Sequence, residues 1–318
     1  MISARGVRNL IAAAACGLAA PAVFASTLYV ANGNAHSVFA YATSHLAQPT
    51  TFVPSGSGGL QNPTGITFGP DGNLYVAGGS TTNDTGVYRY SGTTGAFIDK
   101  FATTNGYPFG LAFEGGSLFL ADYSLNSVER YDASTGAFIS TFVAPGLGGL
   151  SRPRDLMFGP DGNLYVSSPG DAGGNGLRSV LRYNGTTGAF MGAFATGVDA
   201  RGLRFGPDGN LYVASYENSE VLEFDGSTGA FIKVFASGGA LRGPVGVLFG
   251  PDDQMYVSSF NNSEILQYDG STGAFIDTIA MGNGLDGPRL MTIPEPGTIA
   301  LLGVGLAGLG LGRRKRTS

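Results

Sequence analysis

The nine-residue stretch F-G-P-D-G-N-L-Y-V occurs three times in this chain, at residues 68–76, 158–166 and 205–213. Degenerate copies at residues 113–120 and 249–257 keep the same order, so the leading phenylalanines are spaced by 45, 45, 47 and 44 residues. Pro-Asp-Gly-Asn favours a tight turn, because proline presets φ and glycine adopts a positive φ, and Leu-Tyr-Val favours a strand. A period in the forties is the repeat length of β-propeller blades.

A second marker, T-G-A-F, supplies another turn in every repeat. It occurs five times, at residues 94–97, 135–138, 187–190, 228–231 and 272–275. In the first full copy the two markers separate four short β-rich runs, at residues 64–68, 74–77, 87–90 and 96–101. Four antiparallel strands per repeat are the composition of a propeller blade.

The two ends of the repeat region complete one another. Residues 27–31 match the second strand of a repeat, and residues 37–41 and 49–53 match the third and fourth strands. The missing first strand follows the fifth copy, where G-P-R-L-M-T-I at residues 287–293 aligns with N-P-T-G-I-T-F at residues 62–68. One blade is therefore built from both ends of the region, which closes the ring and removes two open sheet edges.

The sequence thus predicts an all-β fold over residues 26–293, a six-bladed β-propeller with four antiparallel strands per blade. Residues 289–293 form the inner strand of the shared blade, beside residues 28–31. The segments at residues 118–131 and 211–222 resemble NHL-type repeats, whose fold is a six-bladed propeller, although most basic residues of that motif are replaced here by Ser, Glu or Gln. The resemblance implies the fold and no particular activity.

The N-terminal end has the pattern of a processing signal. Residues 1–25 combine Arg5 and Arg8 with an apolar stretch and a small-residue cleavage site, which predicts a secretory signal peptide. A buried helix and a lipoprotein signal using Cys16 are the alternatives. Because Cys16 is the single cysteine, cleavage after Ala25 would leave a mature chain without disulfide or thiol chemistry.

The C-terminal residues 294–318 have three parts in a fixed order. Pro294, Glu295 and Pro296 precede an apolar run at residues 298–312, and the chain then carries Arg313, Arg314, Lys315 and Arg316. The run is shorter than the ~20 residues of a membrane-spanning helix, and the basic cluster is typical of the cytoplasmic side. This order resembles the PEP-CTERM sorting signal of Gram-negative bacteria. The resemblance implies the general secretion machinery, transient inner-membrane anchoring, an exosortase as partner, and delivery to the cell surface or exopolysaccharide matrix; a plain tail anchor is the alternative.

The repeat region is acidic, which bears on its partners. Between residues 26 and 293 there are 22 acidic and 12 basic residues, a net charge of −10. Such a body has no broad footprint for phosphates, so we expect no nucleic acid as partner. Most of its repeated carboxylates sit in hairpin turns, at Asp71, Asp161, Asp208 and Asp252. Aspartate favours such turns through its own side chain, so a structural role is expected and a metal ligand is the alternative.

Few residues suggest catalysis. His36 and His45 are the only histidines, and His36 aligns with Asn126, Ser219 and Ser263 in a polar loop, so a structural role is favoured over a base or ligand. Propellers of the gluconolactonase type use metal ligands that begin with an early glutamate, and here none precedes Glu114. Streptogramin lyases use a histidine of a later blade, and none follows His45. We expect no enzyme, cofactor or metal; a divalent-metal-dependent hydrolase or lyase is the alternative.

One set of positions points to recognition. The residue four before each marker phenylalanine opens the innermost strand and lines the mouth of the central channel; these residues are Thr64, Phe109, Arg154, Arg201, Val245 and Arg289. The forked donors of arginine suit carboxylate or sulfate groups. We expect the three arginines to bind an acidic group of an exopolysaccharide, with Phe109 facing a sugar ring. The alternative is charge balance with Asp155 and Asp199.

Together these features favour an exported, non-enzymatic surface or exopolysaccharide-matrix protein, in which the propeller serves binding or scaffolding. An anchored scaffold within an export or polysaccharide machine is a further hypothesis. Bound metal would distinguish the hydrolase or lyase from both.

Overall fold

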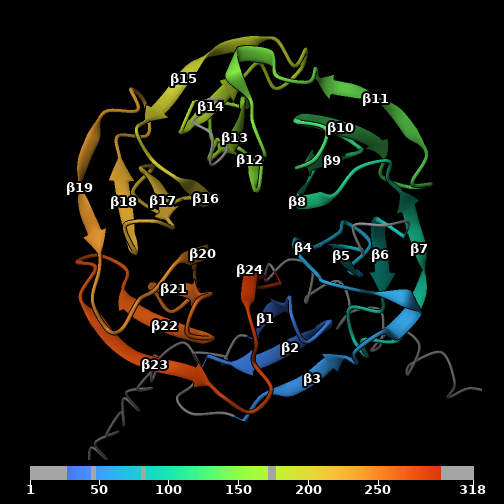
Figure 1. Ribbon diagram of the computed structural model, residues 1–318, viewed down its shortest axis with the longest axis horizontal. Coiled ribbons are helices and arrows are strands. Elements are labelled where there is room, and N and C mark those ends of the chain that lie inside the picture. Colours follow the sequence, from blue (N-terminus) through green and yellow to red (C-terminus); the bar gives the residue numbers. More distant parts are fainter. Residues whose placement is uncertain (1–26, 44–47, 80–83, 171–176, 295–318) are drawn as a thin grey trace, which may run out of the picture.

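The computed structural model shows a ring of β-sheets around a common axis (Figure 1). It describes residues 27–43, 48–79, 84–170 and 177–294. In these ranges six antiparallel sheets of four strands form the ring, so the predicted all-β six-bladed propeller is confirmed. The expected signal peptide, His45 and the sorting residues from Glu295 to Arg316 lie outside the described residues.

The first three blades each run from the axis outward in the order of their strands. Blade 1 contains β24 (Pro288–Thr292), β1 (Thr27–Asn32), β2 (Ser37–Ala42) and β3 (Thr50–Val53). Blade 2 contains β4 (Ile66–Phe68), β5 (Leu74–Gly78), β6 (Gly86–Tyr90) and β7 (Phe97–Thr103). Blade 3 contains β8 (Pro108–Glu114), β9 (Ser117–Asp122), β10 (Ser127–Asp132) and β11 (Phe138–Val143).

The other three blades follow the same order. Blade 4 contains β12 (Leu156–Phe158), β13 (Leu164–Ser168), β14 (Ser179–Tyr183) and β15 (Phe190–Thr196). Blade 5 contains β16 (Ala200–Phe205), β17 (Leu211–Ser215), β18 (Glu220–Phe224) and β19 (Phe231–Ala236). Blade 6 contains β20 (Pro244–Phe249), β21 (Gln254–Ser259), β22 (Glu264–Asp269) and β23 (Phe275–Met281).

Helical structure in the described ranges is limited to two short 3-10 turns. They are η1 (Ser57–Gly59), after β3, and η2 (Leu147–Gly149), after β11. Within the ranges that the structure describes, neither is long and apolar enough to span a membrane.

The ring closes as the sequence predicts. β24 pairs antiparallel with β1, with Thr292 opposite Tyr29 and Met291 opposite Val30. The strand ends at Thr292, one residue earlier than expected, since Ile293 has no ladder partner. Leu290 and Met291 are 8% and 3% exposed, so the C-terminal strand belongs to the core.

The blades are joined by aromatic contacts that repeat around the ring. Tyr75 of β5 packs edge-on against Phe101 of its own blade, at 5.0 Å between ring centroids, and against the marker Phe113 of blade 3, at 4.8 Å. The same sandwich recurs around Tyr29, Phe119, Tyr165 and Tyr212. Edge-to-face pairs stabilise beyond the area that they bury, so each marker phenylalanine holds its blade to the preceding one.

The glycine of T-G-A-F adds a second contact between blades. In blade 3 this glycine is Gly136, with φ +71°, and an added Cβ would lie 1.9 Å from the carbonyl oxygen of Phe101 in blade 2. Only glycine permits both this φ and this approach.

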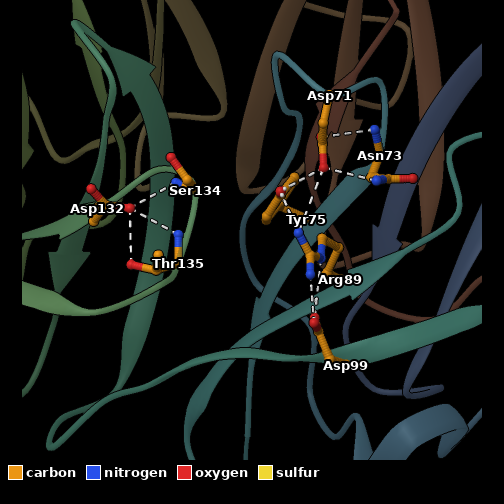
Figure 2. A network of polar contacts seen from close by, with 8 residues as sticks. All are labelled: Asp71, Asn73, Tyr75, Arg89, Asp99, Asp132, Ser134 and Thr135. Atoms are coloured by element: carbon orange, nitrogen blue, oxygen red, sulfur yellow. Dashed lines mark hydrogen bonds and ion pairs between the residues drawn. The ribbon is translucent and has the colours of Figure 1, made fainter.

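The repeated aspartates organise turns. In blade 2, Asp71 accepts hydrogen bonds from the backbone and side-chain nitrogens of Asn73 at 3.1 and 2.8 Å and from the Tyr75 hydroxyl at 3.0 Å (Figure 2). Arg89 lies 3.7 Å from Asp71 and also bonds Asp99. Asp161, Asp208 and Asp252 accept matching bonds. These contacts agree with the structural role expected for the repeated carboxylates.

Removing the closing strand tests the ring. A chain that ends at Leu285 should have an unfolding free energy about 3–6 kcal/mol lower than a chain that ends at Ile293, because it no longer buries Leu290 and Met291 and leaves β1 unpaired. Thermal or urea unfolding of the two truncated proteins measures this difference. Equal stability would show that β24 does not close the ring.

Candidate anion-binding site

The mouth of the propeller is the end of the ring where the inner strands begin. Arg154 lies just before β12, and Arg201 and Arg289 are near the first residues of β16 and β24. The guanidinium carbons of Arg154 and Arg289 lie 4.7 and 5.7 Å from the ring centroid of Phe109. Arg289 belongs to blade 1 and Phe109 to blade 3, so their contact joins two blades that are not neighbours in the ring. The structure therefore brings these expected site residues together near the axis.

Arg154 and Arg289 carry positive charge in a poorly solvated place. Burial first, and then the charges of Arg201 and Arg289, lower the pKa of Arg154 to about 10. Burial also lowers the pKa of Arg289, against the opposing effect of Tyr107. The buried Nε atoms of all three arginines have no hydrogen-bond partner among the described residues. A buried donor without an acceptor is costly, so an anion placed here would relieve both the repulsion and the missing bonds.

Arg201 differs from the other two, because a carboxylate accompanies it. Its Nη2 lies 3.3 Å from Oδ2 of Asp199, whose side chain is 3% exposed. Asp199 also lies 4.0 Å from Arg178, which pairs in turn with Glu217 at 2.5 Å. The expected charge balance thus exists at Arg201.

Asp155 does not balance the arginines. Its Oδ1 accepts the backbone N–H of Leu156 at 2.9 Å, and its Oδ2 accepts that of Leu203, in blade 5, at 3.1 Å. Burial raises the pKa of Asp155 to about 6, the direction opposite to that of a dominant ion pair. This carboxyl therefore links blades 4 and 5 and is not a counter-charge at the mouth.

Phe109 supports the arginines and is not open to a sugar ring. The side chain is 4% exposed, and its ring contacts Tyr107 and Tyr123 at 5.4 and 5.3 Å in addition to the two arginines. The expectation that Phe109 faces a ligand is corrected on this point. Its face is already covered by guanidinium groups, which it holds through cation–π contact.

Three aromatic residues of the site were not predicted from the sequence. Each is the first residue of a loop that follows a second strand, and each stacks with a mouth arginine. The guanidinium carbons lie 4.8 Å from Tyr123 for Arg154, 4.3 Å from Tyr216 for Arg201, and 5.7 Å from Phe260 for Arg289. The sequence does carry a signal for these residues, because each aromatic stands three residues before one of the aligned loop positions 126, 219 and 263. We call the three arginines with Phe109, Tyr123, Tyr216 and Phe260 the arginine–aromatic cluster.

His36 has the structural role expected of its loop position. It adopts φ +55°, close to the values at Asn126, Ser219 and Ser263. Its Nδ1 accepts the N–H of Asn62, in the next loop, at 2.8 Å, and the three equivalent side chains accept N–H groups in the same way. The histidine is thus one of four equivalent acceptors between blades.

The described residues contain no group of three His, Cys, Asp or Glu side chains arranged to hold a metal ion. That the protein needs no metal stays a prediction, which metal analysis of the purified protein can test.

Comparisons with known proteins concern the tail and the fold. Residues 292–316 match the PEP-CTERM protein-sorting motif, which implies export and exosortase-mediated sorting to the cell surface. Among solved structures, 1122 chains match. One, in a nidogen/laminin complex, shares 16% identity at a TM-score of 0.70, covering 84% of this chain and 98% of that chain. Such a likeness shows the fold alone, because one fold hosts many functions. No curated protein sequence matches.

Substitution of His36 separates a structural from a chemical role. His36→Asn should leave the unfolding free energy within a few tenths of a kcal/mol, because asparagine performs the same task at Asn126. His36→Ala should lower it by about 1 kcal/mol, since the Asn62 N–H loses its acceptor. Urea unfolding of the three proteins checks this. If asparagine and alanine are equally destabilising, the hydrogen bond is not the reason for histidine here.

Proposed function

We propose that this protein works outside the cell as a non-enzymatic surface or exopolysaccharide-matrix protein whose arginine–aromatic cluster binds acidic groups of an extracellular polymer. The observation that carries the proposal is the pair Arg154 and Arg289, half-buried side by side at Phe109 with unpartnered Nε atoms in a body of net charge −10. Export and exosortase sorting follow from the PEP-CTERM motif. The NHL-like character of the repeats is part of the proposal, on the segments at residues 118–131 and 211–222.

The ligand class follows from the donors. Arginine presents a planar fork that bonds a carboxylate or sulfate through two parallel hydrogen bonds. The aromatic rings already occupy the guanidinium faces, and Nη2 of Arg289 donates to Oδ1 of Asn62 at 2.8 Å, so the other guanidinium edges are the donors left for a ligand. A single acidic sugar would bind weakly, and many copies of that sugar on one polymer would compensate through avidity.

Titration with an acidic oligosaccharide tests the site. With an otherwise neutral oligosaccharide that carries one galacturonate as the probe, Arg154→Gln and Arg289→Gln should each weaken binding at least tenfold, since each removes a charge-assisted hydrogen bond of about 1.5–3 kcal/mol. Arg201→Gln should weaken it only two- to threefold, because Asp199 already pairs with Arg201. Calorimetry on the chain ending at Ile293 measures these affinities.

Arg130→Gln is the matched control. Arg130 also stacks on a ring, at 5.6 Å from Phe119, but its Nε donates to Ser117 at 2.9 Å. The control should bind as the wild type does. No binding by the wild type, or equal loss in all four variants, would leave the arginines as charge balance within the fold.

The non-enzymatic part of the proposal has its own measurement. The protein purified without added ions should contain less than 0.1 equivalent of divalent metal, and added Ca²⁺, Mn²⁺ or Zn²⁺ should produce no hydrolysis of lactones or cleavage of acidic oligosaccharides. Metal analysis and product detection by mass spectrometry are the readouts. Stoichiometric metal with chelator-sensitive turnover would favour the divalent-metal-dependent hydrolase or lyase instead.

A further inference from the structure

The chain leaves the propeller on the face opposite the mouth. β24 runs from Pro288 to Thr292, with Arg289 at its mouth end, and Thr292 pairs with Tyr29 near the start of β1. The sorting motif begins at Thr292, which is also the last residue of the closing strand. We call the face from which the chain departs the exit face.

The exit face also carries the turns of the two repeat markers. In blade 3 the backbone N–H of Ala133, after β10, bonds the carbonyl of Gly116 in the turn between β8 and β9, at 3.1 Å. The equivalent turns in other blades hold Asp71, Asp161, Asp208 and Asp252. Carboxylates therefore surround the exit face, whereas the three arginines gather at the mouth.

From this geometry we propose that, while the protein is anchored by its C-terminal apolar run, the exit face is turned to the lipid bilayer and the arginine–aromatic cluster is turned away from it. The inference rests on the transient inner-membrane anchoring expected from the sorting signal, which we include in the proposed function. It assigns the exit face as the membrane-facing surface and leaves the mouth free to bind acidic polymer before the protein is released.

The length of the tether excludes the reverse arrangement. Five residues, 293–297, separate Thr292 from the apolar run. Fully extended, they span at most about 18 Å. Because Arg289 and Phe109, from blades that are not neighbours, contact one another near the axis, a path to the mouth goes around the ring. It crosses the width of a four-strand blade, about 14 Å, and then climbs its height, about 16 Å for a five-residue strand. That path of about 30 Å is too long for the tether, so the mouth cannot meet the bilayer.

Charge does not set this orientation. The exit-face carboxylates repel an anionic membrane surface and so provide no electrostatic docking. The tether alone holds the face to the membrane, and the arrangement should persist when salt screens surface charges.

Two single-cysteine variants in blade 3 test the orientation. Leu125→Cys lies in the mouth loop before Asn126 and is 39% exposed, and Ser134→Cys lies in an exposed exit-face turn. The chain's own cysteine, Cys16, lies in the expected signal peptide and is replaced by alanine in both variants. Each full chain is produced in a Gram-negative host without exosortase, and spheroplasts are treated with a 5-kDa polyethylene-glycol maleimide. The same variants ending at Ile293 are the released controls.

In the anchored chain, Ser134→Cys should react at least fivefold more slowly than in the released control, at low and high salt, while Leu125→Cys reacts equally fast in both. Equal rates at Ser134→Cys, or slowing at Leu125→Cys, would overturn the orientation alone. Absence of the full chain from the membrane fraction would overturn the proposed anchoring and the orientation with it. Polymer binding by the released control is measured separately, so the two proposals can fail independently.

Discussion

The contact between a second-strand tyrosine and the marker phenylalanine of the next blade supports every other feature of this molecule. Tyr75 between Phe101 and Phe113 is the pattern, and a related arrangement joins blade 6 to blade 1, where Tyr256 and Ile279 belong to one hydrophobic cluster against which Ile293 packs. The expected mature chain has no cysteine, so packing of this kind replaces disulfides. Since blades in a ring each touch two neighbours, every junction needs such a contact, and at the closing junction isoleucines take the place of the phenylalanines.

The same contact places the residues of the arginine–aromatic cluster. The marker phenylalanine is held between blades, and the residue four positions earlier lies at or just before the start of the same inner strand, about 13 Å nearer the mouth. Arg154 and Arg289 stand at this offset from Phe158 and Ile293, and they converge on Phe109, which stands at the same offset from Phe113. The repeat that packs the core therefore also gathers the side chains at the axis, and a site can vary there without change to the core.

The fold could be predicted because each marker is a local signal with a fixed period, and the closing strand because its register matches residues 62–68. The acidic partners of the mouth arginines were harder to predict from the sequence. Asp155 directly follows Arg154 and Asp199 stands two residues before Arg201, all at or just before the start of an inner strand, where extended backbone places neighbours on opposite faces and residues two apart on one face. That rule explains why Asp199 contacts Arg201 at 3.3 Å and Asp155 faces Leu203 instead. The stacking of Phe109 under two arginines depends on packing between blades 1, 3 and 4, for which a single repeat holds no signal.

The distribution of charge bears on the kind of polymer that the mouth can accept. The body is strongly acidic, and its turn carboxylates lie on the exit face and around the ring, so a densely charged chain such as a nucleic acid is repelled along most of its length. Screening limits this repulsion to about 8 Å at physiological ionic strength. A polymer with one acidic group every few sugars can bring that group to Arg154 and Arg289 while its neutral units lie against the rest of the face. Under the proposed function the acidic body and the arginine pair would act together, because the first would repel dense polyanions and the second would retain isolated acidic groups.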